Sequence, residues 1–222
     1  PLAAESVIDA TGLVVTPGFI DLHTPSPSPL GQYYQVFDGV TTALELEAGF
    51  SPVLEYAAGI SSTPLINYGA SAGHVSLRIY EKNGLQMSAD MSTPTPVGFK
   101  GWMTALKFFF TDFDTALSES LYEEASEEEL TTLRARLNSE LDDGSLGIGL
   151  PLDYFSLAIQ EAEMRMIFEV ASKRGAPIFI HIRRGIDGDP SGLHEVIDYA
   201  REYGTSLHVC HITHNAISNL EL

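Results

Sequence analysis

The sequence predicts an α/β fold built on parallel strands, and three observations support this prediction. Six short runs rich in apolar and β-branched residues recur along the chain, amphipathic stretches separate them, and the connecting loops are short. This alternation is typical of an open doubly wound sheet and equally of a closed eight-stranded barrel. The expected strands cover residues 18–23, 41–47, 64–69, 145–150, 177–182 and 206–212.

Three helices are expected between the later strands, and each ends at a glycine. In the first of them, Ser126 and Glu129 form a capping box, and leucines then recur at helical spacing until Gly144. The other two helices are expected over about 159–175 and 191–204, where apolar residues repeat on one face. These patterns place helices between neighbouring strands, as a βαβ arrangement requires.

A barrel is favoured over an open sheet because two nucleotide-binding signals are missing. Neither a Gly-x-Gly-x-x-Gly fingerprint nor a Walker loop follows the first strand. Residues 80–125 surround an aromatic patch with Met, Ser, Thr, Pro and acidic residues, so we expect an irregular insertion that partly covers the barrel. The proline-rich stretch 24–29 must be extended, because proline cannot continue a helix.

The composition fits one ordinary domain, and its negative net charge disfavours binding to polyanions. The chain has 222 residues, of which 44% are hydrophobic, and 12 Lys and Arg stand against 30 Asp and Glu, giving a net charge of −18. Such a surface repels nucleic-acid phosphates and anionic lipid headgroups. No apolar run approaches the roughly 20 residues that span a bilayer. We therefore expect neither nucleic acid nor a membrane as a partner.

The cysteine count and the first residues bear on location. Cys210 is the one cysteine, so the chain forms no internal disulfide. The sequence begins at Pro1 without an initiator Met, and no charged-then-apolar leader follows. We expect a cytoplasmic protein, and the given sequence is expected to be a fragment.

Polar side chains end four of the expected strands. His23, Glu47, His181 and His211 stand at or near the carboxyl ends, where a parallel barrel carries its chemistry. Imidazoles and a carboxylate that converge on one mouth are the ligands of a zinc-type site, and such an ion lowers the pKa of bound water from 15.7 to about 7. Glu45 shares a face with Glu47, and Glu47 is the preferred ligand because it lies nearer the strand end.

Each of these residues also has a structural interpretation. A lone histidine at a strand end is more often a hydrogen-bonded core or loop residue, and both glutamates could face a polar helix interface. Arg183 suits a bidentate grip on a substrate carboxylate, and a salt bridge within the acidic shell is equally compatible with it. His194 and His208 are expected to be structural, and His214 fits either role.

Several motifs resemble a known superfamily. Residues 7–23 are similar to the opening of the amidohydrolase superfamily, where a small β-domain leads into the first barrel strand and its His-x-His metal motif. Residues 41–49 look most like the N-acyl-D-glutamate deacylases. The other motifs follow the order of the N-acyl-D-amino-acid deacylase branch, and they cover residues 38–42, 67–74, 144–150, 181–183 and 210–211.

The resemblance implies a (β/α)8 TIM-type barrel with one or two divalent ions, usually zinc. Its implied reaction is hydrolysis of a linear amide by metal-bound hydroxide, converting an N-acyl-D-amino acid, the small-molecule partner, to a D-amino acid and a carboxylate. The second-strand ligand of D-aminoacylases resembles a cysteine whose place falls on Ala48, so the glutamate is inferred from the residues themselves. The implied metal ligands are His23, Glu47, His181 and His211, and the implied substrate contacts are Arg183 and His74.

The chain departs from the family pattern in two places. Pro25 stands where the second histidine of His-x-His belongs, and proline offers no side-chain donor atom. The family's catalytic aspartate follows the eighth strand and is expected beyond Leu222. We therefore expect about six of eight strands in a partial barrel over 18–222, a β-domain remnant over 1–17, and little activity of the chain alone.

Two other functions remain open. Pro25 is compatible with a metal-free, non-catalytic barrel relative that acts as a binding or assembly module. A cyclic amidase of the hydantoinase or dihydroorotase type is disfavoured, because residues 147–150 hold no lysine at the fourth strand and Lys107 lies in the expected insertion. Arg183 and Arg184 favour an anionic substrate.

Overall fold

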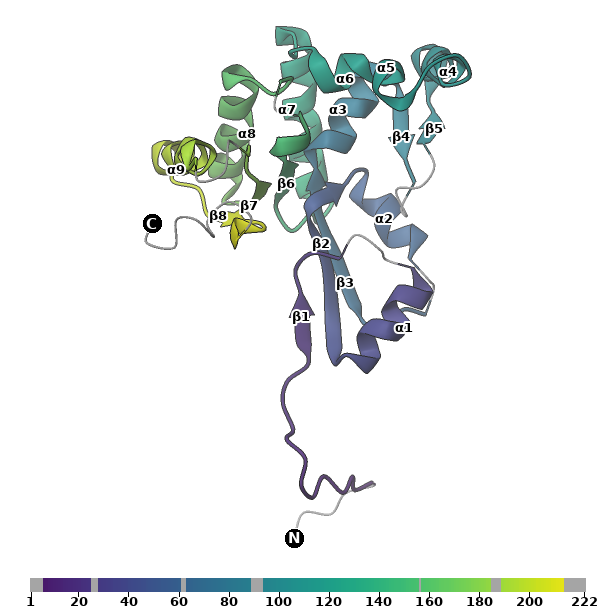
Figure 1. Ribbon diagram of the computed structural model, residues 1–222, viewed down its shortest axis with the longest axis vertical. Helices are drawn as coiled ribbons and strands as arrows, with labels where there is room; N and C mark the ends of the chain where they lie inside the picture. Colours follow the sequence, from purple (N-terminus) through teal and green to yellow (C-terminus); the bar gives the residue numbers. More distant parts are fainter. Residues whose placement is uncertain are drawn as a thin grey trace.

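A computed structural model describes residues 6–24, 28–60, 63–88, 94–155, 157–184 and 189–213. Within these ranges, one sheet of six parallel strands curls into part of a barrel with helices on its outer side (Figure 1). The predicted partial (β/α)8 barrel is therefore confirmed. In spatial order the strands are β1 (Phe19–Asp21), β2 (Val40–Phe50), β3 (Asn67–Gly73), β6 (Ile148–Pro151), β7 (Ile178–His181) and β8 (Leu207–Val209).

All six predicted strands exist, and the largest difference lies in β3, which begins three residues and ends four residues later than predicted. The β2 strand continues to Phe50, beyond the predicted end, and its register against β3 shifts between Glu45 and Phe50. Gly49 makes this possible: its φ is 62°, and a Cβ there would lie 2.5 Å from Ser71 Oγ. The shift lies at the level of Glu47, so it bears directly on where that carboxylate points.

The helices that cover the sheet are also close to their predicted bounds. The capping box of Ser126 and Glu129 is present, and the glycines that follow α8 and α9 have φ values of 61° and 65°. These three helices are α7 (Glu127–Asp142), α8 (Glu161–Arg174) and α9 (Ser191–Tyr203). Near the N-terminus, the covering helices are α1 (Pro29–Phe37), α2 (Val53–Gly59) and α3 (His74–Asn83).

Residues 80–125 contain more regular structure than their composition indicates. The short strands β4 (Leu85–Met87) and β5 (Pro94–Pro96) pair antiparallel, and three helices follow, namely α4 (Gly98–Lys107), α5 (Phe113–Ala116) and α6 (Ser118–Tyr122). Residues 6–18 are mostly exposed and contain a turn at Thr11 and Gly12, without a strand among them. The insertion at about 80–125 and the β-domain remnant over 1–17 stay predictions.

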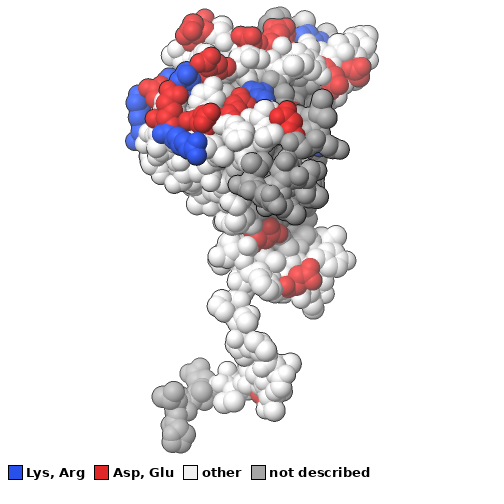
Figure 2. Space-filling model, turned by 60° about the vertical axis from the view of Figure 1, so that its left-hand side comes forward, with Lys and Arg blue, Asp and Glu red and all other residues white. Residues whose placement is uncertain are grey.

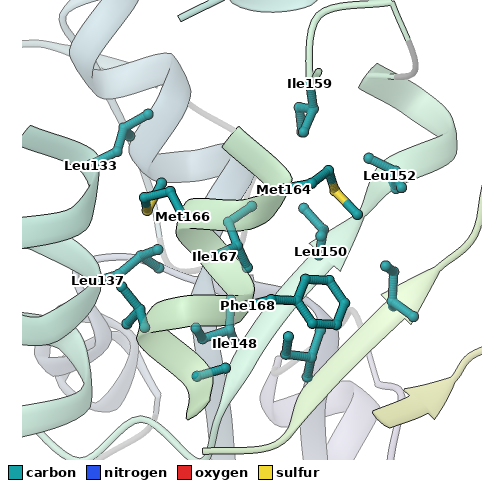
Figure 3. Packing of buried hydrophobic residues seen from close by; sticks show 14 of the residues in the cluster. Leu133, Leu137, Ile148, Leu150, Leu152, Ile159, Met164, Met166, Ile167 and Phe168 are labelled. Carbon is teal, nitrogen blue, oxygen red and sulfur yellow. The ribbon is translucent and has the colours of Figure 1, made fainter. Parts of the chain in front are cut away.

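The main core lies between the sheet and α7 and α8. Leu133 and Leu137 of α7 pack toward Ile167 of α8, which in turn covers Ile148 and Leu150 of β6 (Figure 3). Each of these five side chains is 1% exposed or less, and burying one such side chain contributes about 1.5–3 kcal/mol. This packing fixes β6 and β7 against the helices, and with them the side chains at the strand ends.

The charged side chains cover the helical part of the molecule. Figure 2 shows acidic and basic groups intermixed there, whereas the N-terminal stretch carries few of them. Arg165, for example, pairs with Glu161 at 2.9 Å and with Glu202 at 2.5 Å. Every helix in the described ranges is too short or too polar to pass through a lipid bilayer.

Candidate metal centre

Four side chains meet at the carboxyl ends of the parallel strands. His23 follows β1 by two residues, Glu47 lies in the last part of β2, His181 is the last residue of β7, and His211 follows β8 by two residues. In a parallel barrel these ends share one mouth. The strands β1 and β8 are opposite edges of the sheet, yet the rings of His23 and His211 are only 5.1 Å apart.

Glu47 is the centre of this group. One carboxylate oxygen, Oε2, is 2.9 Å from Nε2 of His211 and 3.9 Å from Nε2 of His23, and the other, Oε1, is 3.1 Å from Nδ1 of His181. A ligand atom from each of His23, Glu47 and His211 lies within 4.8 Å of the other two. The distances suit a single cation held by imidazole nitrogen and carboxylate oxygen.

His181 belongs to the same cluster but stands slightly apart from the triad. Its ring centroid is 5.4 Å from that of His211, and its Nδ1 is turned toward Glu47. The ring of His181 also packs edge-to-face against Tyr154, which lies in the 3₁₀ turn after β6, and the two ring centroids are 5.5 Å apart. Sequence reasoning missed Tyr154, because a tyrosine in a short turn carries no signal of its own.

Glu45 lies beside His23 on the same strand as Glu47. Its Oε1 is 3.6 Å from Nδ1 of His23, and its side chain is 2% exposed. The Glu45 carboxylate raises the pKa of His23 above its ordinary value by favouring the protonated ring. Burial opposes the shift, and the charges of Glu45, Glu47 and Asp21 add to it.

The donor set fits a divalent cation. Among the described residues, the ion pairs of Glu45 and Glu47 are all with histidines. Four buried atoms of the cluster have no hydrogen-bond partner in the described part of the chain, namely Nδ1 of His23, Oε2 of Glu45, Oε2 of Glu47 and Nε2 of His181. Buried carboxylates are costly unless they are paired or bind a metal, so a cation would neutralise this group.

Cys210 also faces the cluster, and its thiol interacts with Glu47. Burial raises the pKa of its thiol to about 12, and the charge of Glu47 adds to the shift. The thiol is therefore neutral at physiological pH in this structure. Its neighbour His211 has a φ of 49°, a left-handed conformation that few residues other than glycine adopt, and it marks the turn that brings the ring to Glu47.

Arg183 lies two residues beyond β7, at the same end of the sheet as the cluster. Its Nε is 3.1 Å from Glu195 Oε2, and its guanidinium also donates to the carbonyl of Ile159. The neighbouring Arg184 pairs with Asp153 at 2.6 Å. The salt bridge that was the alternative for Arg183 is thus present, and its contact with a substrate stays a prediction.

His74 has a different environment from the one expected of a substrate contact. It is the first residue of α3, its side chain is 0% exposed, and its Nε2 is 2.7 Å from Glu163 of α8. Arg78 pairs with the other oxygen of Glu163 and is equally buried. The structure thus joins His74 to a buried charge network between α3 and α8, while its role toward a substrate stays a prediction.

The Glu163 network makes stability depend on pH. Burial by itself would raise the pKa of Glu163, but the hydrogen bonds and positive charges of His74 and Arg78 outweigh it and hold the pKa below its ordinary value of 4.5. A lowered folded-state pKa stabilises the protein above the unfolded value, and this contribution is lost as the pH falls through the folded pKa.

We therefore expect the free energy of unfolding to decrease as the pH is lowered from about 5 toward 3. Urea titrations at several pH values measure this slope, which Glu163→Gln should reduce. Glu124→Gln removes an exposed acid near α6 and is the matched control. Equal slopes in the wild type and Glu163→Gln would contradict the prediction.

Several other predicted positions lie outside the cluster or outside the described residues. Pro25 and His214 belong to segments outside the described ranges. His194 is exposed on α9, and the ring of His208 packs near Phe179 at 5.9 Å. Lys107 pairs with Glu119 at 3.1 Å within the 80–125 segment.

The sequence and the fold of the chain are similar to those of several known hydrolases. No model of a known protein family matches the chain. An allantoinase from Enterococcus faecalis is 24% identical over 95% of this chain, and a D-aminoacylase from Alcaligenes xylosoxydans xylosoxydans is 26% identical over 94% of it. The crystal structure of N-acyl-D-glutamate deacylase from Bordetella bronchiseptica, complexed with zinc and a phosphonate inhibitor, matches 92% of the chain with a TM-score of 0.58 at 20% identity.

The chain resembles the N-acyl-D-amino-acid deacylase branch of the amidohydrolase superfamily. The resemblance stated from the motifs is thereby confirmed, and the solved deacylase shares the partial barrel with this chain. The chain spans 46% of the allantoinase, 42% of the D-aminoacylase and 44% of the solved deacylase, which is less than half of each.

Proposed function

We propose that the chain is the metal-binding part of a divalent-metal-dependent hydrolase that cleaves the linear amide of an N-acyl-D-amino acid. The observation that carries this proposal is the position of Glu47, whose two oxygens lie within 4 Å of three histidines from three different strand ends. Zinc is the proposed ion, because nitrogen and carboxylate ligands suit it and a zinc-bound deacylase has this fold.

The side chains of the cluster would have two roles, which are to bind the ion and to balance its positive charge. A bound divalent cation would acidify a coordinated water and polarise the amide carbonyl. His23, His181 and His211 would offer neutral ring nitrogens to it, and Glu47 would offer an anionic oxygen. The two buried carboxylates, Glu45 and Glu47, would offset the charge of the cation and leave the site close to neutral.

Arg183 would orient the substrate at the same mouth. Glu195 holds Nε of its guanidinium, so the side chain keeps one direction at the end of β7. A planar guanidinium suits the carboxylate that every N-acyl amino acid carries. The finer choice of D-glutamate as the amino acid follows the resemblance of residues 41–49 and stays part of the proposal.

A cyclic amidase is the second candidate, and one observation favours it. The allantoinase relative covers 95% of the chain at 24% identity. Both reactions attack a carbonyl carbon bonded to nitrogen, and the same ion and histidines could serve either. A metal-free binding module remains an alternative, because Pro25 stands where the second histidine of His-x-His belongs and offers no donor atom.

Metal content tests the proposal directly, because holding the ion is the role proposed for His23, Glu47, His181 and His211. We expect the purified chain to bind zinc in a one-to-one ratio, measured by calorimetry and by elemental analysis after dialysis. His211→Ala should lose most of this binding. His194→Ala removes an exposed histidine of α9 and is the matched control.

The ligand arm of the experiment separates the two hydrolase candidates. N-acetyl-D-glutamate should bind the zinc-loaded chain more tightly than allantoin does, and Arg183→Leu should remove that preference. A wild-type chain that stays free of zinc, or a His211→Ala variant that binds it equally well, would contradict the proposed metal centre. A preference for allantoin would leave the metal centre standing and replace the linear amide by a cyclic one.

A further inference from the structure

Glu45 is a buried carboxylate that the proposed ligand set does not use. Its side chain is 2% exposed, and it lies on β2 next to the turn that carries His23. The backbones of the two residues form a bridge, and the N–H of Thr24 donates to the carbonyl of Leu44 at 2.9 Å. The main chain therefore holds the His23 ring and the Glu45 carboxylate side by side.

Each residue of this pair has one buried polar atom without a hydrogen-bond partner. Nδ1 of His23 and Oε2 of Glu45 have no hydrogen-bond partner among the described residues. The other carboxylate oxygen, Oε1, is 3.6 Å from Nδ1 and accepts from the N–H of Ala48 at 3.1 Å. Buried polar groups in folded proteins almost always find partners, and the Glu45 carboxylate lies beside Nδ1 of His23 as an acceptor for its N–H.

The pairing would decide which nitrogen of His23 can hold a cation. A neutral imidazole carries its proton on one nitrogen and a lone pair on the other. A carboxylate that accepts from Nδ1–H keeps the lone pair on Nε2, which lies 3.9 Å from Glu47 Oε2 on the side of the cluster. His23 is the one histidine that the first strand can supply to the ion, because residue 25 is proline.

We propose that Glu45 is a positioning residue, which fixes the ring and the tautomer of His23 so that Nε2 faces the ion while Glu45 itself makes no bond to it. The proposal rests on the proposed metal centre for its purpose. Its geometry is independent of any ion, since the tautomer is a property of the metal-free chain. Partners that orient a metal-bound histidine typically account for about 10- to 100-fold in metal affinity.

The test compares two substitutions that differ in one property. Glu45→Gln keeps an acceptor oxygen for Nδ1–H and should lower zinc affinity by less than about 10-fold, whereas Glu45→Leu removes the acceptor and should lower it by about 10- to 100-fold. Zinc affinity is measured by competition with a chromophoric chelator. Glu169→Gln, in α8 where the carboxylate pairs with Arg134 of α7, is the control and should leave the affinity unchanged.

A second readout needs no metal. Long-range nitrogen–proton NMR spectra of the chain with ¹⁵N-labelled histidine report the tautomer of His23, at a pH where the ring is neutral. We expect the Nδ1–H form in the wild type and in Glu45→Gln, and a shift toward Nε2–H in Glu45→Leu. Circular dichroism confirms that each variant is folded, and Glu45→Gln keeps the test open if Glu45→Leu is not.

Three outcomes would overturn the role of Glu45. An Nε2–H tautomer in the wild type would exclude the pairing, and unchanged affinity in Glu45→Leu would exclude its effect on the ion. An equal loss of affinity in Glu45→Gln and Glu45→Leu would show that the carboxylate binds the ion directly. A wild type with the Nδ1–H form but without zinc would instead contradict the proposed function and leave the pairing intact.

Discussion

Replacing Glu47 with glutamine should reduce the zinc affinity of the chain by about 100-fold or more. Groups that merely orient a ligand account for about 10- to 100-fold, and Glu47 lies within 4 Å of all three histidines of the cluster. Glutamine has nearly the same shape but no charge, so the buried site would lose one of the two carboxylates that balance the cation. Calorimetric titration with zinc, or chelator competition, measures the change.

The design separates a ligand from a structural residue. Glu47→Gln removes a buried charge whose ion pairs in the described part of the chain are all with histidines, so the metal-free variant should be as stable to urea as the wild type or slightly more stable. Glu169→Gln controls for the general effect of one charge less. Wild-type affinity in Glu47→Gln would remove Glu47 from the metal centre.

Arg78→Leu should lower the free energy of unfolding by about 3–5 kcal/mol. The Arg78 side chain is 0% exposed, and its Nε donates to the carbonyl of Ser120 at 2.8 Å while another guanidinium nitrogen pairs with Glu163. Leucine fills part of the volume but leaves the Glu163 carboxylate buried with His74 as its remaining partner. Domains of this kind are stable by only about 5–15 kcal/mol, so the loss is a large share.

Urea denaturation followed by circular dichroism measures the effect, with Arg201→Leu as the control on the exposed face of α9, where the side chain is 77% exposed. The double variant Arg78→Leu with Glu163→Leu should recover part of the loss, because it removes both charges at once. A loss below about 1 kcal/mol in Arg78→Leu would mean that the network is not a structural support.

Local patterns were sufficient to predict the elements that depend on neighbouring residues. The capping box of Ser126 and Glu129 and the glycine stops of α8 and α9 are where the sequence indicates, because each depends on residues a few positions apart. The same reasoning placed His23, Glu47, His181 and His211 at strand ends, and the parallel topology then brings them to one mouth.

Other features depend on contacts between distant segments, and short-range patterns carry no signal for them. Glu47 and His181 are 134 residues apart, and the sequence does not reveal which oxygen meets which nitrogen. The partner of His74 is Glu163, 89 residues away, so the motif that contains His74 gives no signal for the buried charge network that it joins. The register shift in β2 depends on Gly49 meeting Ser71, which periodicity does not encode.

The cluster draws its members from the first two and the last two strands of the sheet. His23 follows β1 and His211 follows β8, which are the two edge strands in the order β1-β2-β3-β6-β7-β8. A cation bound by both histidines would therefore link the two edges of the described sheet. Ligand binding to the folded state alone adds about 2.7 kcal/mol of stability when the free ion is at 100 times its dissociation constant. The midpoint of thermal unfolding would then rise with the concentration of the free ion.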